Sequence, residues 1–486
     1  MKSLYYSFLL AGLLIAGIAA RGTESTATNS PVSPLSGNSG TNPASQIPPK
    51  PIFHPQDFGA KGDGTTVDTT AIQKAIDACA GKGGSVVLTP GTYLSKPIVL
   101  KGGMTFHLEK GAVLLGTAAI EDYPVLLPDS QPNRLCRSLI YACNADNLTI
   151  SGAGSIEGQP KLLNLPPQDK KNGSEAKRPS LIRIFRSKNV SVRDITLRNP
   201  CMWTEIYSEC DHLLIDHVTV DAPAGIENLD GLDVCDCSGV IVRNCLIFSE
   251  DDGICLKSHL ERGLQDVTVE NNRISSFHAN GIKLGTATTG PISHLIFRNN
   301  TVDYAKLGGI CIESVDGSAV SDVNIQGLFL NQVCQPIYVR LGHRTKSRPV
   351  GSINGVVFQD VKAIGTHDQS KASISITGIP GANVQNVTLK DCFFQMPGGV
   401  MSIPGMPVEH EKDYPQSNIF GNTPAYGIFI RHAVGIVLDH VVFGFLKPDA
   451  RPWICEMDAD VRKLNCRDLK LIPLSDDGRV EMSTAR

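Results

Sequence analysis

The sequence predicts an all-β protein that folds as a right-handed parallel β-helix, a solenoid with a short N-terminal capping helix. The first observation is a repeat: short runs with alternating apolar residues return roughly every 23 to 33 residues, as in stacked repeat architectures. The second is composition, because 46 Gly and 30 Pro supply many turns while only 6% of the residues are aromatic. The third is that helical periodicity occurs in one stretch near the start of the repeats. These observations indicate short parallel strands around an aliphatic core.

The first 50 residues precede the predicted folded body. Residues 1–20 combine a positive charge at Lys2, a short apolar run and small residues at its end, which is typical of a cleaved signal peptide. Residues 21–50 are rich in Ser, Thr, Asn, Pro and Gly, which predicts a disordered linker. A retained membrane anchor is the alternative interpretation of the apolar run. We expect a secreted or periplasmic protein without membrane contact beyond the cleaved signal.

One amphipathic helix is expected at residues 68–79, ahead of the strand repeats. The apolar residues between Ile72 and Cys79 fall on one helical face. Asp68 or Thr69 can cap its N-terminus. Because the first rung of a sheet stack has an exposed edge, we expect this helix to cover that end.

The strand repeats define the predicted catalytic domain, residues 51–447, and leave residues 448–486 as a C-terminal extension. Asn244, Asn271 and Asn299 recur at the polar breaks between strands. Asn tolerates the left-handed backbone conformation of turns, so these residues are interpreted as turn residues rather than ligands. Parallel strands in such a stack lie about 4.8 Å apart, which brings equivalent residues of successive repeats together.

Three carboxylates end apolar strand-like runs in consecutive repeats: Asp230, Asp251 and Asp252. Clustered carboxylates raise the pKa of at least one member, which is the electrostatic condition for pairing an acid with a base at neutral pH. Such a pair hydrolyses glycosidic bonds, one group protonating the leaving oxygen and another activating water. A solvated acidic turn or a calcium site is the alternative interpretation.

Two motifs give the chain a family resemblance. Asn228–Asp230 matches an Asn-x-Asp motif, and Asp251–Asp252 with Lys257–Ser258 matches an Asp-Asp motif followed by an apolar strand ending in Lys-Ser. Over residues 57–445 the chain therefore resembles glycoside hydrolase family 28, the polygalacturonase and rhamnogalacturonase group of the pectate-lyase-superfamily β-helices. The resemblance implies an inverting hydrolase without a metal or other cofactor.

The same resemblance implies roles for the motif residues. Asp251 is expected to be the general acid, Asp230 and Asp252 are expected to position the water, and Asn228 is expected to contact substrate.

The chain departs from the family pattern at two motifs. The family's Gly-His-Gly falls where Asn280 replaces the His, and Asn280 is a candidate substrate-binding residue. The family's Arg-Ile-Lys, which grips a substrate carboxylate, falls near Cys311–Glu313, where neither base is present. Lys283, Arg340 and Arg344 are the candidate replacement cations, because an Arg fork suits a carboxylate.

We predict an O-glycosyl hydrolase that cleaves pectic polysaccharide of the galacturonan or rhamnogalacturonan type. The alternatives are a polysaccharide lyase on the same fold, a non-catalytic glycan-binding β-helix and a hydrolase of a neutral glycan. The net charge of −3 gives no reason to expect nucleic acid as a partner, and we expect a monomer. Long loops at residues 159–178 and 398–423 are placed to wall off one end of the substrate groove.

Overall fold

The computed structural model describes residues 50–124, 137–160, 178–222, 225–365 and 372–472. The chain divides into two units, Met1–Pro49 and Lys50–Arg486, and the described residues belong to the second. The predicted signal peptide and all but the last residue of the predicted linker lie outside the described residues. Among the described helices, none has the length and apolar character needed to span a bilayer.

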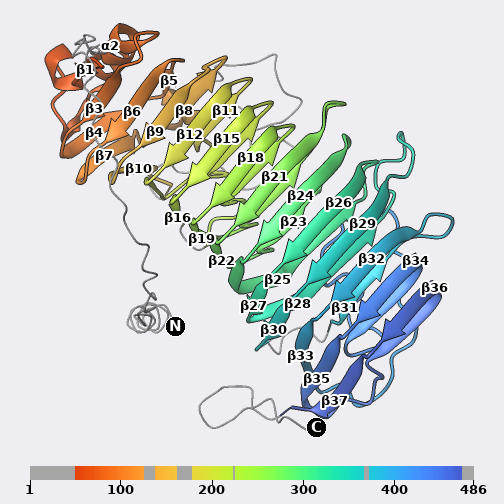
Figure 1. The fold of residues 1–486 in the computed structure, drawn as a ribbon. Helices are drawn as coiled ribbons and strands as arrows, with labels where there is room; N and C mark the ends of the chain where they lie inside the picture. Colours follow the sequence, from red (N-terminus) through yellow and green to blue (C-terminus); the bar gives the residue numbers. More distant parts are fainter. Residues whose placement is uncertain (1–49, 125–136, 161–177, 223–224, 366–371, 473–486) are drawn as a thin grey trace, which may run out of the picture. The chain divides into compact units, whose positions relative to one another are not determined.

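The second unit is a right-handed parallel β-helix built from strands β1 (Ile52–Phe53) to β37 (Arg467–Leu471), as predicted (Figure 1). The strands pair in parallel into three ladders. One ladder runs from β1 through β3 (Ser85–Leu88) to β32 (Val384–Lys390), which pairs with β34 (Ile428–Asp439), and another runs from β2 (Asp63–Val67) through β4 (Gly91–Ser95) and β35 (Val442–Lys447) to β37. We call the third the site sheet; its strands are β5 (Ile98–Leu100), β8 (Ser138–Cys143), β11 (Ser180–Phe185), β14 (Glu205–Ser208), β17 (Leu232–Cys235), β20 (Ile254–Lys257), β23 (Ile282–Leu284), β25 (Thr301–Ser314), β28 (Val333–Leu341), β31 (Ile374–Thr377), β34 (Ile428–Asp439) and β36 (Ile454–Leu464).

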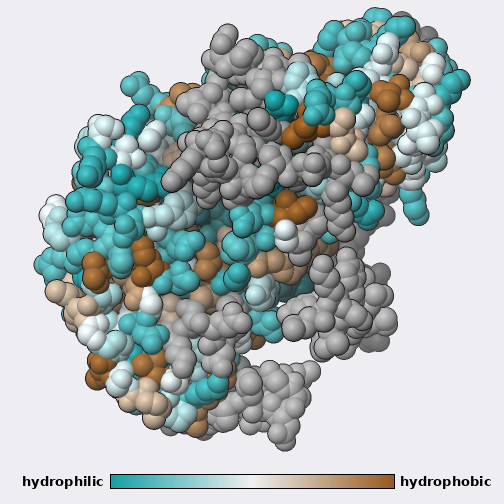
Figure 2. Space-filling view, turned by 180° about the vertical axis from the view of Figure 1, so that it is seen from behind, coloured by the Kyte–Doolittle hydropathy of each residue, from teal (hydrophilic) through white to brown (hydrophobic). Residues whose placement is uncertain are grey.

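Side chains of the site sheet alternate between the core and the outer face, as strand geometry requires. On the inner side Ile254, Ile282, Ile310 and Ile337 are paired in register on successive rungs and are completely buried. The residues one position later in each strand face outward. Figure 2 shows that hydrophilic residues cover much of the coloured surface on the visible face, where hydrophobic residues form small separate groups. The stacked aliphatic interior therefore leaves the outer face of the site sheet available for polar, functional side chains.

The turns between strands follow the sequence prediction. Asn244, Asn271 and Asn299 have φ values of 55°, 56° and 51°. This left-handed conformation is one that Asn adopts more readily than most residues, so the recurrent Asn marks the corner between two strands in these three successive rungs.

The predicted capping helix is α2 (Thr69–Cys79), which buries Ile72, Ala75, Ile76 and Cys79 together with Ala71. Asp68 occupies the N-cap position but makes no capping hydrogen bond. Its carboxylate instead accepts hydrogen bonds from the backbone amides of Lys61 and Gly62, at 2.7 and 2.9 Å. Asp68 therefore fastens the preceding loop to the helix rather than capping the helix.

The β-helix continues beyond the predicted boundary at residue 447. β36 pairs with β34, and β37 (Arg467–Leu471) pairs with β35. These last strands are largely exposed on their outer side, so their sequence lacks the continuous apolar alternation of inner rungs. Residues 454–471 of the predicted C-terminal extension are thus part of the solenoid, and residues 473–486 lie outside the described part of the chain.

A carboxyl group interrupts the aliphatic interior of the site sheet. Glu205 is paired in register with Ile182 and Leu232 on the inner side of the sheet, and Tyr207 donates a hydrogen bond to it at 2.6 Å. Burial raises the pKa of Glu205 to about 8, although the Tyr207 hydrogen bond opposes the shift. Near neutral pH the protonated form therefore predominates in the folded protein.

Glu205→Gln is expected to flatten the pH dependence of stability. In the wild type the folded state holds the Glu205 proton more tightly than the unfolded chain does, where the pKa of this carboxyl group is near its ordinary value of 4.5. The stability due to this group is complete below pH 4.5 and is lost as pH rises toward 8, by about 1.4 kcal/mol per pH unit. Urea unfolding of the wild type and of Glu205→Gln at pH 5 and pH 8 measures the free energy of unfolding of each protein. If the two proteins differed in this free energy by the same amount at both pH values, the prediction would be wrong.

Candidate active site

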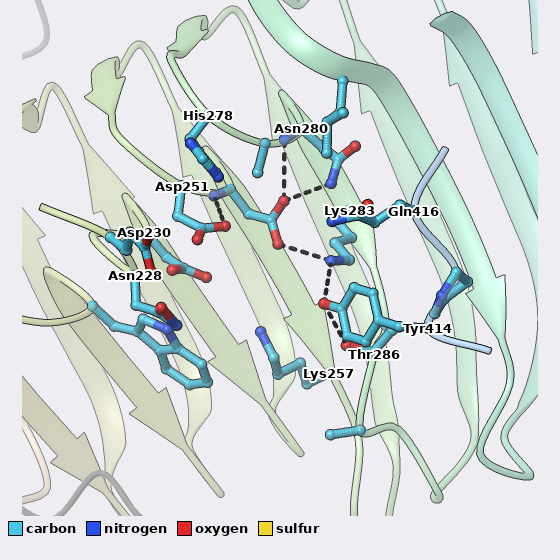
Figure 3. A pocket seen from close by; sticks show the side chains of 18 residues that line it. Asn228, Asp230, Asp251, Lys257, His278, Asn280, Lys283, Thr286, Tyr414 and Gln416 are labelled. Atoms are coloured by element: carbon cyan, nitrogen blue, oxygen red, sulfur yellow. Dashed lines mark hydrogen bonds and ion pairs between the residues drawn. The ribbon is translucent and has the colours of Figure 1, made fainter. Parts of the chain in front are cut away.

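A pocket of about 590 Å³ lies on the outer face of the site sheet, around β17, β20 and β23 (Figure 3). It brings together six of the eight predicted site residues: Asn228, Asp230, Asp251, Asp252, Asn280 and Lys283. The residues come from segments preceding three successive rungs and from β23 itself. The stacking of the repeats therefore creates the cluster.

Asp230, Asp252 and Asn280 occupy equivalent positions on these rungs. Each lies two residues before a strand residue that points into the core, and these core residues are paired in register from one rung to the next. Each is followed by a glycine, and the repeat of glycines has a steric cause. A Cβ on Gly231 would lie 2.5 Å from the carbonyl oxygen of Gly253. A Cβ on Gly253 would lie equally close to the carbonyl oxygen of the glycine on the next rung. Only glycine allows the rungs to approach closely enough to align the three polar side chains.

Asn280 orients Asp252. The Asn280 side-chain amide and backbone amide both donate to Asp252 Oδ1, at 2.7 and 3.1 Å. The Asn280 side-chain oxygen accepts a hydrogen bond from the backbone amide of Gly308 at 2.8 Å, which fixes the direction of the amide. The residue that replaces the family's His therefore contacts one of the carboxylates directly.

Two buried ammonium groups balance the carboxylates. Lys283 Nζ lies 3.1 Å from Asp252 Oδ2, and both side chains are 6% exposed. Lys257 Nζ lies 2.7 Å from Asp233 Oδ1 and 4.4 Å from the ring centroid of Trp203. Positive charge is thus built into the floor of the pocket, beneath the acidic groups.

The surroundings separate the pKa values of the three aspartates. Burial raises the pKa of Asp230, and the neighbouring carboxylates Asp251, Asp233 and Asp252 raise it further. Burial and Asp252 also raise the pKa of Asp251. Burial alone would raise the pKa of Asp252, but Lys283, Lys257 and the Asn280 hydrogen bond outweigh it and hold that pKa below its usual value. The cluster therefore contains an ionised Asp252 beside carboxyl groups that retain protons more readily.

The carboxylates of Asp230 and Asp252 also lie near a thiol. One oxygen of each and the Cys255 sulfur lie within 4.8 Å of one another. Such a group can hold a cation, but Lys257 donates a hydrogen bond to Cys255 and Lys283 pairs with Asp252. The side chains present already supply positive charge at this point.

The structure does not bring Arg340 and Arg344 into the pocket lining, contrary to their expected role as substrate cations. Arg340 is 1% exposed and donates to the backbone carbonyls of Gly378 and Glu409. Arg344 pairs with Asp316 through two hydrogen bonds of 2.9 and 2.6 Å. The segment that carries Glu409 folds over Arg340 and buries it. The sequence around Arg340 does not predict this long-range contact.

Sequence reasoning missed two aromatic residues of the pocket, Trp203 and Tyr414. Tyr414 lies in the long segment before β34, and its hydroxyl makes hydrogen bonds of 3.2 Å with Lys283 and Thr286. Trp203 precedes β14, one rung before Asp230. The Lys-Ser ending of the second motif contained the signal for Lys257, but nothing near Tyr414 in the sequence marks it as part of the site.

Comparison with known proteins identifies a family that this chain resembles in sequence. The model of the glycosyl hydrolases family 28 matches residues 87–409. A probable polygalacturonase from Vitis vinifera is 27% identical over 372 residues, which cover 68% of this chain and 73% of that protein. An endo-polygalacturonase from Pectobacterium carotovorum subsp. carotovorum is 25% identical over 354 residues, covering 68% and 85%.

Among solved structures, a family 28 exopolygalacturonase from Yersinia enterocolitica superimposes with a TM-score of 0.68 at 20% identity, covering 85% of this chain and 78% of that one. A hyperthermoactive exopolygalacturonase from Thermotoga maritima gives 0.61 at 22% identity, covering 72% and 88%. These structures share the fold of the described chain.

Proposed function

This chain belongs to glycosyl hydrolase family 28 and is an O-glycosyl hydrolase, and we propose that its substrate is a pectic polysaccharide of the galacturonan or rhamnogalacturonan type. The observation that carries the proposal is the pocket in which Asp230, Asp251 and Asp252 converge above two buried lysines. Carboxylates supply the acid and base for hydrolysis, and ammonium groups suit an acidic sugar.

The electrostatics support a division of roles among the three aspartates. Asp251, whose pKa is raised, holds the proton that passes to the leaving glycosidic oxygen. Asp252, whose pKa is lowered, is the ionised group that takes a proton from the attacking water. Asp230 has an oxygen within 4.8 Å of one on Asp252 and helps to hold that water. We propose attack from the face opposite the leaving group, which inverts the anomeric configuration.

Lys283 is the proposed contact for a substrate carboxylate. It is the cation of the pocket floor nearest Asp252, and it lies on the rung preceding the positions where the family's Arg-Ile-Lys falls. Asn228 lines the opposite part of the pocket and is proposed to bind a sugar hydroxyl. Trp203 offers an aromatic surface to a sugar ring.

Activity is expected to follow a bell-shaped pH profile. On the acid side kcat/KM falls as Asp252 becomes protonated. This limb lies at a pH below the usual pKa of an Asp, because the pKa of Asp252 is lowered. On the basic side kcat/KM falls as Asp251 loses its proton. This limb lies at a pH above the usual pKa of an Asp, because the pKa of Asp251 is raised. Initial rates across pH at low substrate concentration measure both limbs. A rate that continues to rise above neutral pH would contradict the assignment of the proton to Asp251.

A substrate screen tests the proposed function and its alternatives. The purified protein is incubated with galacturonan, rhamnogalacturonan, carboxyl-reduced galacturonan and neutral glycans, and the product ends are analysed. We expect saturated products with new reducing ends from one of the two pectic polymers, and weaker cleavage of the carboxyl-reduced polymer. Products with an unsaturated, UV-absorbing ring would indicate a lyase, binding without cleavage would indicate a glycan-binding protein, and equal cleavage of the reduced polymer would contradict the pectic assignment.

We also propose that the protein is exported and acts as a monomer, as residues 1–20 and an extracellular polymeric substrate suggest. N-terminal sequencing of the protein recovered from the periplasm or the medium tests removal of the signal peptide. Light scattering of the purified protein tests the monomer.

A further inference from the structure

We propose that residues 399–427, here called the end loop, close the substrate groove on its C-terminal side, so that the enzyme cuts at chain ends rather than within chains. The inference rests on the proposed function and specifies its mode of action. The end loop connects β33 (Phe393–Gly398) to β34.

The end loop covers the face along which a groove would continue. Lys283, Cys311 and Tyr338 are paired in register on successive rungs and alternate outward from the buried ladder. Cys311 and Tyr338 are nevertheless completely buried, because Phe420 of the end loop packs on them with Ile419 beside it. Past Lys283 the outer face of the site sheet is therefore occupied by the protein's own chain.

Two buried arginines hold the end loop in place. Arg340 and Arg431 are each 1% exposed, and their guanidinium carbons lie 5.1 and 5.4 Å from the ring centroid of Phe420. Arg340 donates to the backbone carbonyl of Glu409, and Arg431 donates to that of Pro407 at 2.8 Å. Buried guanidinium donors left without partners are costly, so undocking the end loop would carry a substantial penalty.

Tyr414 forms the end of the pocket. Its hydroxyl is held at 3.2 Å by both Lys283 and Thr286. The guanidinium of Arg344 lies 5.3 Å from its ring centroid and is itself fixed by Asp316. Figure 3 shows Asn228 and Asp230 on one side of the pocket and Tyr414 on the other. A polysaccharide that passes the carboxylates meets this ring.

The same closure accounts for the missing uronate clamp. The Arg-Ile-Lys motif falls at Cys311–Glu313, and Cys311 and Glu313 are 0% and 1% exposed beneath the end loop and its neighbours. Burial raises the pKa of Glu313 to about 8, so an uncharged carboxyl predominates at neutral pH where the family has a base. Cations at these positions would not reach a substrate, because the groove ends before them.

Product analysis on galacturonan tests the proposal. The wild type is expected to release one short product from the first time points and to lower viscosity slowly for each bond cut. A variant carrying Tyr414→Ala, Pro415→Gly and Gln416→Ala removes the end of the pocket, and we expect it to form products of intermediate length with a several-fold larger viscosity loss per bond. Met401→Ala changes an end-loop residue that is 77% exposed and should keep the wild-type products. Intermediate-length products from the wild type at early times would overturn the proposal.

A second measurement separates this proposal from the proposed function. The backbone amide of His343 donates to the carbonyl of Glu411 in the end loop at 2.6 Å. Hydrogen exchange at His343 should be slow in the wild type and at least tenfold faster in Arg340→Gln, which loosens the end loop. Fast exchange in the wild type would overturn closure. Slow exchange in a protein that cleaves no pectic polymer would leave the closure supported and refute only the pectic substrate.

Discussion

Asp251→Asn is expected to lower kcat on galacturonan by about 10²–10⁴-fold, the usual contribution of a positioned general acid. The amide has no proton that it can transfer to the leaving oxygen. The fold should survive, because burial and Asp252 already favour the neutral form of Asp251, and an amide is neutral with a similar shape. The backbone amide of Asp252 donates a hydrogen bond to Asp251 Oδ1 at 2.9 Å, and the side-chain oxygen of Asn can accept the same hydrogen bond.

Glu250→Gln is the matched control for Asp251→Asn. Glu250 is the preceding residue, is also buried and has a pKa raised to about 7 by burial and by Asp251, but it does not line the pocket. Steady-state kinetics and thermal unfolding of both variants measure the contrast. Full activity in Asp251→Asn, or an equal loss in Glu250→Gln, would refute Asp251 as the acid.

Lys283→Met is expected to lower kcat/KM on galacturonan by roughly 10–10²-fold, because it removes the proposed charged contact with the substrate carboxylate, worth about 1.5–3 kcal/mol. Breaking the buried ion pair with Asp252 is expected to lower the free energy of unfolding as well, by about 3–5 kcal/mol. Lys283 is the largest charge effect that holds the pKa of Asp252 down. Its removal should raise that pKa, so the acid limb of the pH profile should move upward. The loss should be smaller on carboxyl-reduced galacturonan, where the proposed uronate contact is absent.

Lys283→Arg keeps the charge and is the control for Lys283→Met. We expect it to keep the acid limb near the wild-type position even if the larger head group weakens substrate binding. Rate measurements across pH on both polymers, with thermal unfolding of each variant, separate catalysis from folding. An unchanged acid limb in Lys283→Met would refute the influence of Lys283 on Asp252, and an equal loss on both polymers would refute the uronate contact.

The sequence alone determined the β-helix and the carboxylate cluster, because these features depend on repetition, and it determined the capping helix through the helical periodicity of its apolar residues. Equivalent residues of neighbouring repeats must meet in a stacked fold, so the spacing of the two motifs was sufficient to predict one carboxylate cluster. The structure shows which residues are equivalent, because it brings an oxygen of Asp230 and one of Asp252 within 4.8 Å of each other. The Asn corners were predictable for the same reason, since Asn244, Asn271 and Asn299 occupy the same turn position in three successive repeats.

Only the tertiary structure determined where the candidate substrate-binding cations lie and where the substrate groove ends. Arg340 looked like a substrate contact, yet the end loop buries it, and Tyr414 reaches the pocket from a segment more than a hundred residues after Lys283. No repeat relates that segment to the rungs that it covers. Its position depends on long-range packing around Phe420 and on hydrogen bonds to buried guanidinium groups, and neither leaves a periodic pattern in the sequence.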